Sequence, residues 1–311
     1  MSFRTIDELE VALREADYLP DRGLATALFL GLALEKPVLL EGEAGVGKTE
    51  AAKALATALD ARLIRLQCYE GLDVSHAVYE WNYPRQLLHI RAAQEGSVSE
   101  QELFGSEFLI RRPLLEAIDS DEGVVLLIDE IDRADEEFEA FLLEVLSDFQ
   151  VSIPEIGTIK AKHVPYVVLT SNRTRELSDA LRRRCLFFWI DYPPFEKEVR
   201  VVKAKVPGIN EHLADQICVF MQGVRSIRLI KTPGVAETLD WGLSLVALHR
   251  DSLDHETVRD TMAAFLKDNR DVQKMAGKRL DVLLGAASGN GRAPGDVIPQ
   301  LREQLTALEA S

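Results

Sequence analysis

Residues 42–49 constrain the fold more than any other segment of this 311-residue chain. They fit the pattern G-x-x-x-x-G-K-[ST], in which glycines let backbone N–H groups converge on phosphate oxygens. In this pattern the lysine reaches the β- and γ-phosphates and the final hydroxyl binds Mg²⁺. We therefore predict that a nucleotide is held by Gly42, Glu43, Ala44, Gly45, Val46, Gly47, Lys48 and Thr49.

The segments around this loop predict a parallel α/β sheet. An apolar strand candidate, Val38–Leu40, precedes the loop, and a helix candidate, Glu50–Leu59, follows it. This order of strand, Gly-rich loop, helix and strand is typical of open parallel sheets. Helices are also predicted at 6–16, 22–34 and 136–149, strands at 62–68, 123–128, 166–170 and 184–190, and a small hairpin at 151–161.

A change of composition marks the end of the predicted sheet. Tyr192-Pro193-Pro194 interrupts the chain, and the residues from 196 to 284 have helical apolar spacing with few strand signals. We expect an α/β nucleotide-binding domain at 1–195, a small all-helical lid domain at 196–284, and a linker with a C-terminal helix at 285–311.

Two carboxylates end the apolar strand at 123–128. Asp129 and Glu130 come at the carboxyl end of a buried strand, where open α/β sheets have their ligand crevice. We predict that Asp129 holds Mg²⁺ together with Thr49, and that Glu130 polarises the attacking water. The alternative is that the acidic pair caps the helix that begins in Ala134–Glu136.

Polar residues downstream complete a candidate hydrolytic set. If the strand at 166–170 lies beside the strands of the loop and the carboxylates, it delivers Asn172 near the γ-phosphate. An arginine supplied by a neighbouring subunit stabilises charge on the transferred phosphoryl group. We predict this role for Arg184, then Arg183, although the run Arg182–Arg184 also fits a solvated face, and Arg133 is expected at the subunit interface.

The overall charge and the cysteines exclude other classes. The formal charge is −15, which disfavours nucleic acid as a partner. Cys68, Cys185 and Cys218 lie far apart in sequence and are expected to be reduced core thiols. The acidic start of the chain and the lack of a run of about 18 apolar residues predict a cytoplasmic protein with no membrane span.

Over residues 20–250 this set of motifs resembles an AAA+ ATPase, most closely of the MoxR branch. The MoxR-like segments are Arg112–Ala117, Leu142–Asp148 and the hairpin at 151–161. Within that branch, Tyr79–Pro84 and Arg183–Cys185 are similar to the accessory ATPases encoded with carbon monoxide dehydrogenase and related molybdenum hydroxylases.

The resemblance implies a homo-oligomer, a hexameric ring with ATP and Mg²⁺ at its subunit interfaces. It also implies a chaperone that remodels or matures a client metalloenzyme, often with a von Willebrand factor A-domain partner. The sequence departs from the branch at Thr232-Pro233-Gly234, where Ser-Pro-Arg is usual and the arginine touches ATP. The contact is then expected from Lys231 or Arg228, or it is missing.

Three other functions fit parts of the sequence. A metabolic kinase or GTPase is disfavoured because the chain has no N-K-x-D segment and because the acidic pair favours water as nucleophile. A DNA-acting AAA+ motor is disfavoured by the charge. A nucleotide-gated interaction module with little intrinsic turnover remains open because the lid arginine is missing.

Overall fold

The structure, a computed structural model, describes residues 3–92, 100–289 and 294–310. Contacts divide the chain into two compact units. The first contains the residues up to Gly42 and Lys48–Ile190, and the second contains Glu43–Gly47 and the residues from Asp191 onward. The predicted fold class is confirmed, because a parallel sheet flanked by helices is followed by an all-helical region.

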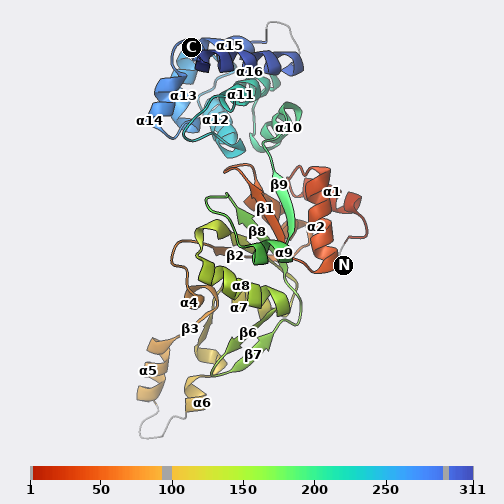
Figure 1. Cartoon of the computed structure of the whole chain (residues 1–311), viewed down its shortest axis with the longest axis vertical. Coiled ribbons are helices and arrows are strands. Elements are labelled where there is room, and N and C mark those ends of the chain that lie inside the picture. The colour runs from red at the N-terminus through yellow and green to blue at the C-terminus, as the bar shows by residue number, and fades with distance from the viewer. Residues whose placement is uncertain (1–2, 93–99, 290–293, 311) are drawn as a thin grey trace. The chain divides into compact units, whose positions relative to one another are not determined.

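Five parallel strands form the central sheet of the first unit, in the order β2-β5-β8-β1-β9 (Figure 1). Every residue of β1 and β5 is buried, which agrees with the apolar runs Val38–Leu40 and Val124–Ile128 at their starts. β2 is an edge strand. Its apolar residues Ile64 and Leu66 are buried, whereas its polar residues Arg65 and Gln67 are exposed. The bounds are β1 Val38–Gly42, β2 Arg62–Gln67, β5 Val124–Asp129, β8 Tyr166–Ser171 and β9 Leu186–Ile190.

Helices cover the sheet because alternate strand residues are apolar on both of its faces. Leu39, Leu126 and Leu169 belong to one buried cluster with the apolar residues of α7 and α8. On the other face Val38 contacts α2, and α3 contacts four of the five strands. The helices of this unit's core are α1 Ile6–Glu15, α2 Arg22–Leu34, α3 Lys48–Ala58, α7 Pro113–Ile118, α8 Glu136–Asp148 and α9 Asp179–Arg184, with the 3₁₀ turn η2 at Ile131–Arg133.

A hairpin-like insertion stands between β2 and α7, where the sequence predicted no elements. Two antiparallel strands pair Tyr79 with Arg111 and Trp81 with Leu109, and short helices lie between them. Helix α5 of this insertion exposes Leu87 and Leu88, which are 57% and 65% exposed. Its elements are α4 Val74–Ala77, β3 Tyr79–Trp81, α5 Tyr83–Ala92, α6 Glu100–Leu103, η1 Ser106–Phe108 and β4 Leu109–Arg111.

A second, smaller hairpin confirms the expectation for residues 151–161. Strands β6 (Gln150–Ile153) and β7 (Gly157–Lys160) pair antiparallel after α8. The strand predicted at 184–190 begins later, at Leu186. The prediction was wrong for Arg184 because the Ser178 hydroxyl accepts from the Leu181 N–H and starts helix α9, which continues through Arg184.

The second unit has a helical core built around three aromatic rings. Phe220, Trp241 and Phe265 contact one another with ring centroids 4.5 to 5.8 Å apart. The helices are α10 Phe195–Lys205, α11 Glu211–Val224, α12 Val235–Ala247, α13 His255–Phe265, α14 Asn269–Met275, α15 Lys278–Ala287 and α16 Pro294–Ala310. Helix α15 thus continues past residue 284, where the sequence predicted that a linker begins.

A buried ion pair lies among these helices. Arg225 donates from two nitrogens to the carboxylate of Glu198, at 2.7 and 2.8 Å, and one of these nitrogens also donates to the Thr238 hydroxyl at 2.7 Å. The Glu198 side chain is fully buried and the Arg225 side chain is 6% exposed. Such a pair contributes little over an apolar pair, but the loss of one partner leaves a buried charge.

The three cysteines are free, as predicted from their spacing. Burial first, and then the neighbouring carboxylates of Asp129, Asp132 and Glu130, raise the pKa of Cys68 to about 12. Burial also raises the pKa of Cys185 to about 12. Both side chains are therefore neutral thiols near pH 7. No helix among the described residues is long and apolar enough to cross a membrane.

Replacement of Arg225 by Ala should destabilise the second unit by about 3–5 kcal/mol, because Glu198 then stays buried without a cation. The control is Lys203→Ala, which breaks the exposed pair between Lys203 and Glu211 and should cost no more than about 1 kcal/mol. Urea unfolding followed by circular dichroism measures both. Equal losses in the two variants would contradict this account of the buried pair.

Candidate nucleotide and metal site

The polar residues predicted from sequence meet at one edge of the sheet. Strand β8 lies between β5 and β1, with Leu169 opposite Ile128 on one side and Leu39 on the other. The carboxyl ends of these parallel strands therefore carry Asp129, Glu130 and the residues after Ser171 to the same place. The acidic pair does not cap helix α8, because Asp135 accepts from the Phe138 N–H instead.

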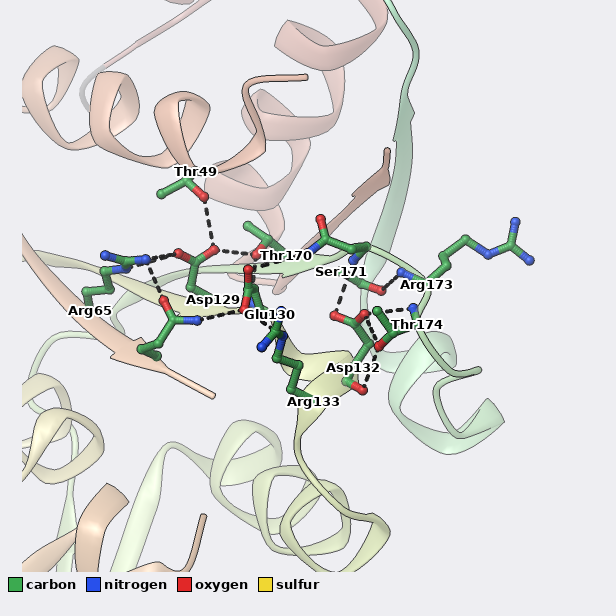
Figure 2. Close-up of polar contacts among 12 residues, drawn as sticks. Thr49, Arg65, Asp129, Glu130, Asp132, Arg133, Thr170, Ser171, Arg173 and Thr174 are labelled. Carbon is green, nitrogen blue, oxygen red and sulfur yellow. Dashed lines mark hydrogen bonds and ion pairs between the residues drawn. The ribbon is translucent and has the colours of Figure 1, made fainter. Parts of the chain in front are cut away.

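Asp129 is the most enclosed carboxylate at this edge, with 2% exposure. Its Oδ1 accepts hydrogen bonds from the hydroxyls of Thr49, at 3.0 Å, and Thr170, at 2.5 Å. Its Oδ2 accepts from Nε and Nη2 of Arg65, at 3.0 and 2.5 Å. Figure 2 shows these partners around the carboxylate. The hydroxyl of Thr49 and the carboxylate of Asp129 are hard oxygen donors, the type that Mg²⁺ requires, so the two predicted metal-binding residues are together.

Glu130 is held at the end of β5 in an unusual backbone conformation. Its φ and ψ are 56° and 48°, in the left-handed region, and its N–H donates to the Thr170 hydroxyl at 2.9 Å. Non-glycine residues in this region are uncommon and cluster at functional sites. The backbone thus leaves the strand direction at this residue.

The Glu130 carboxylate has three side-chain partners among the described residues. Oε2 accepts from Nε2 of Gln67 at 3.1 Å and forms an ion pair with Nε of Arg133 at 2.9 Å. Nδ2 of Asn172 lies 3.5 Å from Oε1. Arg133 pairs with the residue predicted to activate water, and its expected place at a subunit interface stays a prediction. Asn172 and Glu130 are close enough to contact one water molecule.

Asp132 organises the segment that carries Asn172, and sequence reasoning missed it. Its side chain is buried and accepts from the N–H of Asn172, at 3.2 Å, and from the N–H and hydroxyl of Thr174, at 2.8 and 2.7 Å. Figure 2 shows Asp132 and Thr174 in contact beside Ser171. The signal in the sequence was Asp132, a third acidic residue shortly after a buried strand. Acidic residues are also common in exposed loops, so this signal did not distinguish a buried role.

The three arginines of helix α9 are not equivalent. Arg182 donates to the buried carboxylate of Glu41 at 2.8 Å and lies over the ring of Phe187. Arg183 and Arg184 are exposed, and within the described part of the chain no ion pair joins either of them to an acidic residue. Arg182 therefore has a structural partner, while the two residues predicted to act in a neighbouring subunit face solvent.

The backbone of the loop fits the predicted phosphate site. Gly45 and Gly47 have φ of +75° and +97°, which side chains rarely adopt. Lys48 is 6% exposed, begins helix α3, and donates from Nζ to the carbonyl of Gly42 at 2.8 Å. A curled glycine loop, a buried ammonium and a helix N-terminus are the features that bind phosphate.

The second unit explains why Gly234 stands where an arginine was expected. The carbonyl of Gly45, in the loop segment that belongs to this unit, accepts from the N–H of Val235 at 2.9 Å and of Ala236 at 3.2 Å. A Cβ at position 234 would lie 2.6 Å from the carbonyl oxygen of Ala44. No larger side chain fits without a shift of the backbone. Arg225 fixes this turn by donating to the carbonyls of Pro233 and Gly234.

Residues 37–185 match the model of the AAA domain (dynein-related subfamily). This segment begins before β1 and ends after α9, so it contains the loop, both acids, Asn172 and the arginines. Residues 37–185 are thus similar to an AAA domain, and the parallel sheet with a helical region after it has the AAA+ fold.

Similar proteins include uncharacterised proteins of two staphylococci. Those of Staphylococcus haemolyticus and Staphylococcus epidermidis are 28% and 29% identical over 210 residues, which is 65% of this chain and 72% of theirs. Among solved structures, the RuvB Holliday junction branch migration motor of Thermotoga maritima is 19% identical, with a TM-score of 0.47 over 90% of this chain and 85% of that chain.

Replacement of Asp132 by Ala should destabilise the first unit by about 2–3 kcal/mol, because partly buried N–H and O–H donors lose a charged acceptor. Asp121→Ala is the control, since Asp121 forms an exposed pair with Lys162, and its loss should cost less than about 1 kcal/mol. Chemical denaturation of both variants measures the difference. The role assigned to Asp132 requires the larger loss.

Proposed function

We propose that this protein is a Mg²⁺-dependent ATPase that hydrolyses the β–γ phosphoanhydride bond of ATP. The observation that carries the proposal is the grouping at one sheet edge of Thr49, Asp129, Glu130 and Asn172, with contacts of 3.0 to 3.5 Å between them. This set supplies a metal site, a carboxylate for the attacking water and an amide beside it.

The proposed roles follow from the surroundings of each residue. Lys48 and the loop amides of Gly42–Gly47 hold the phosphates, and Thr49 and Asp129 hold Mg²⁺, which neutralises charge on the phosphates when bound. Glu130 takes up the proton of the attacking water, and Asn172 orients that water. Gln67 and Arg133 hold the Glu130 carboxylate by contacts that must loosen before it can act.

We also propose that the protein works as a homo-oligomer, as a hexameric ring. The support is that Arg183 and Arg184 are exposed and unpaired among the described residues, whereas Arg182 is engaged with Glu41. An arginine that acts on ATP in another subunit must be free of such an internal partner. Arg184 remains the first candidate for this role and Arg183 the second.

The client is proposed from the resemblance to the MoxR branch. On that basis the ring remodels or matures a metalloenzyme in the cytoplasm, in some cases with a von Willebrand factor A-domain protein. The net charge of −15 disfavours a DNA-acting motor. A nucleotide-gated module with little turnover differs from the proposed ATPase in one measurable property, the hydrolysis rate.

The first prediction concerns turnover. Glu130→Gln should lower the ATPase rate by about 10²- to 10⁴-fold, because the amide cannot accept the proton of water. Mg²⁺-dependent ATP binding should persist, because Thr49 and Asp129 are intact. Phosphate release measured over a range of protein concentrations, with and without Mg²⁺, tests this. Tight ATP binding without turnover in the wild-type protein at every concentration would support the switching module instead.

The second prediction concerns the arginine supplied between subunits. Arg184→Ala should lower turnover by about 10³-fold and leave ATP affinity nearly unchanged. Mixed rings of Arg184→Ala and Glu130→Gln subunits should regain activity, since some sites then combine an intact Glu130 with an intact Arg184. Arg183→Ala in the same mixing experiment ranks the two candidates, and Arg259→Ala, an exposed arginine of α13, is the control. Mixed rings with no gain in rate would remove Arg184 from this role.

A further inference from the structure

One cation at the site has no part in the proposed hydrolysis. Arg65 lies on the edge strand β2, two residues before Gln67, which is opposite Asp129 in the register of β2 and β5. Its guanidinium donates from two nitrogens to Oδ2 of Asp129, and Nη2 also donates to Oε1 of Gln67 at 2.5 Å. Figure 2 shows Arg65 facing the carboxylate from the side opposite Thr170.

The position of Arg65 matters because Asp129 is a buried charge. The side chain of Asp129 is 3% exposed, whereas that of Arg65 is 49% exposed. A buried carboxylate is unfavourable unless a cation or several donors compensate it. The two hydroxyls that donate to Oδ1 are neutral, whereas the guanidinium that donates to Oδ2 is positively charged. Arg65 therefore compensates the charge of Asp129 in this arrangement. Mg²⁺ held by the same carboxylate would supply the same compensation.

We propose that Arg65 is a positioning residue that takes the place of Mg²⁺ at Asp129 and so makes metal binding depend on nucleotide. Arg65 fixes the carboxylate plane through Oδ2 and leaves Oδ1 directed at the Thr49 hydroxyl. Its positive charge repels a divalent ion that arrives alone. An ion that arrives with the negative phosphates of a nucleotide is not repelled in this way. This inference rests on the proposed function for the identity of the metal site.

Without nucleotide, the protein should therefore bind divalent ions more weakly than it would if Arg65 carried no charge. Loss of the guanidinium charge should raise this affinity by about tenfold or more, because like charges a few ångströms apart in a partly buried site interact strongly. Binding of a metal to the folded state alone also stabilises that state. Mg²⁺ without nucleotide should therefore raise the melting temperature of Arg65→Gln more than that of the wild type.

The experiment is a Mn²⁺ titration of the full chain without nucleotide, followed by electron paramagnetic resonance of the free ion. Arg65→Gln should bind Mn²⁺ about tenfold more tightly than the wild type. Arg65→Lys, which keeps the charge, should stay near the wild type. Arg62→Gln is the matched control, because it removes the same charge from the same strand, where Arg62 pairs with Glu116 instead. The double variant Arg65→Gln with Asp129→Asn should lose the gained affinity.

Several outcomes would overturn the proposal. They are unchanged or weaker Mn²⁺ binding by Arg65→Gln, an equal gain in Arg62→Gln, or a gain that survives Asp129→Asn. Tight Mn²⁺ binding by the wild type without nucleotide would overturn it even if Arg65→Gln failed to fold. Because the titration needs no nucleotide and no turnover, a failure of the proposed ATPase appears separately, in the Glu130→Gln comparison.

Discussion

The buried carboxylate of Asp129 is the interaction on which the arrangement of this site depends. Its four hydrogen bonds come from helix α3, strand β8 and strand β2, so one side chain joins three separate elements. Each partner satisfies an acceptor that would otherwise be buried and unpaired. The Thr170 hydroxyl extends the network, since it also accepts from the Glu130 N–H. The positions of the two acids are thereby linked through a single threonine.

Much of this arrangement was predictable from local sequence. The glycine loop, the apolar strands and the acids at the end of β5 are short patterns whose physical meaning does not depend on distant residues. The placement of Asn172 needed one assumption about strand neighbours, and the pairing of β8 with β1 and β5 confirms that assumption. Buried parallel strands are therefore well specified by their apolar runs, and polar residues at their ends are well placed.

The contacts that could not be predicted are those that require strand register or an irregular backbone. Arg65 reaches Asp129 only because β2 pairs with β5 in one particular register, which a six-residue strand does not reveal. The insertion between β2 and α7 was missed because its strands have three residues each, too few for periodicity. Within it, Trp81 is buried while Tyr83 is 59% exposed, a difference invisible in sequence.

The exposure of helix α5 determines which of its residues can be substituted without a change at the site. Apart from Gln86, its residues are exposed, whereas Trp81, Phe108 and Leu109 of the insertion belong to the buried cluster of the first unit. Substitutions on its outer surface therefore change no contact of the strands that carry the acids. Exposed residues of α5 can therefore be exchanged in the laboratory without a change to the hydrogen bonds of Asp129 and Glu130. The fold thus separates an exposed helix from the buried acids within the same unit.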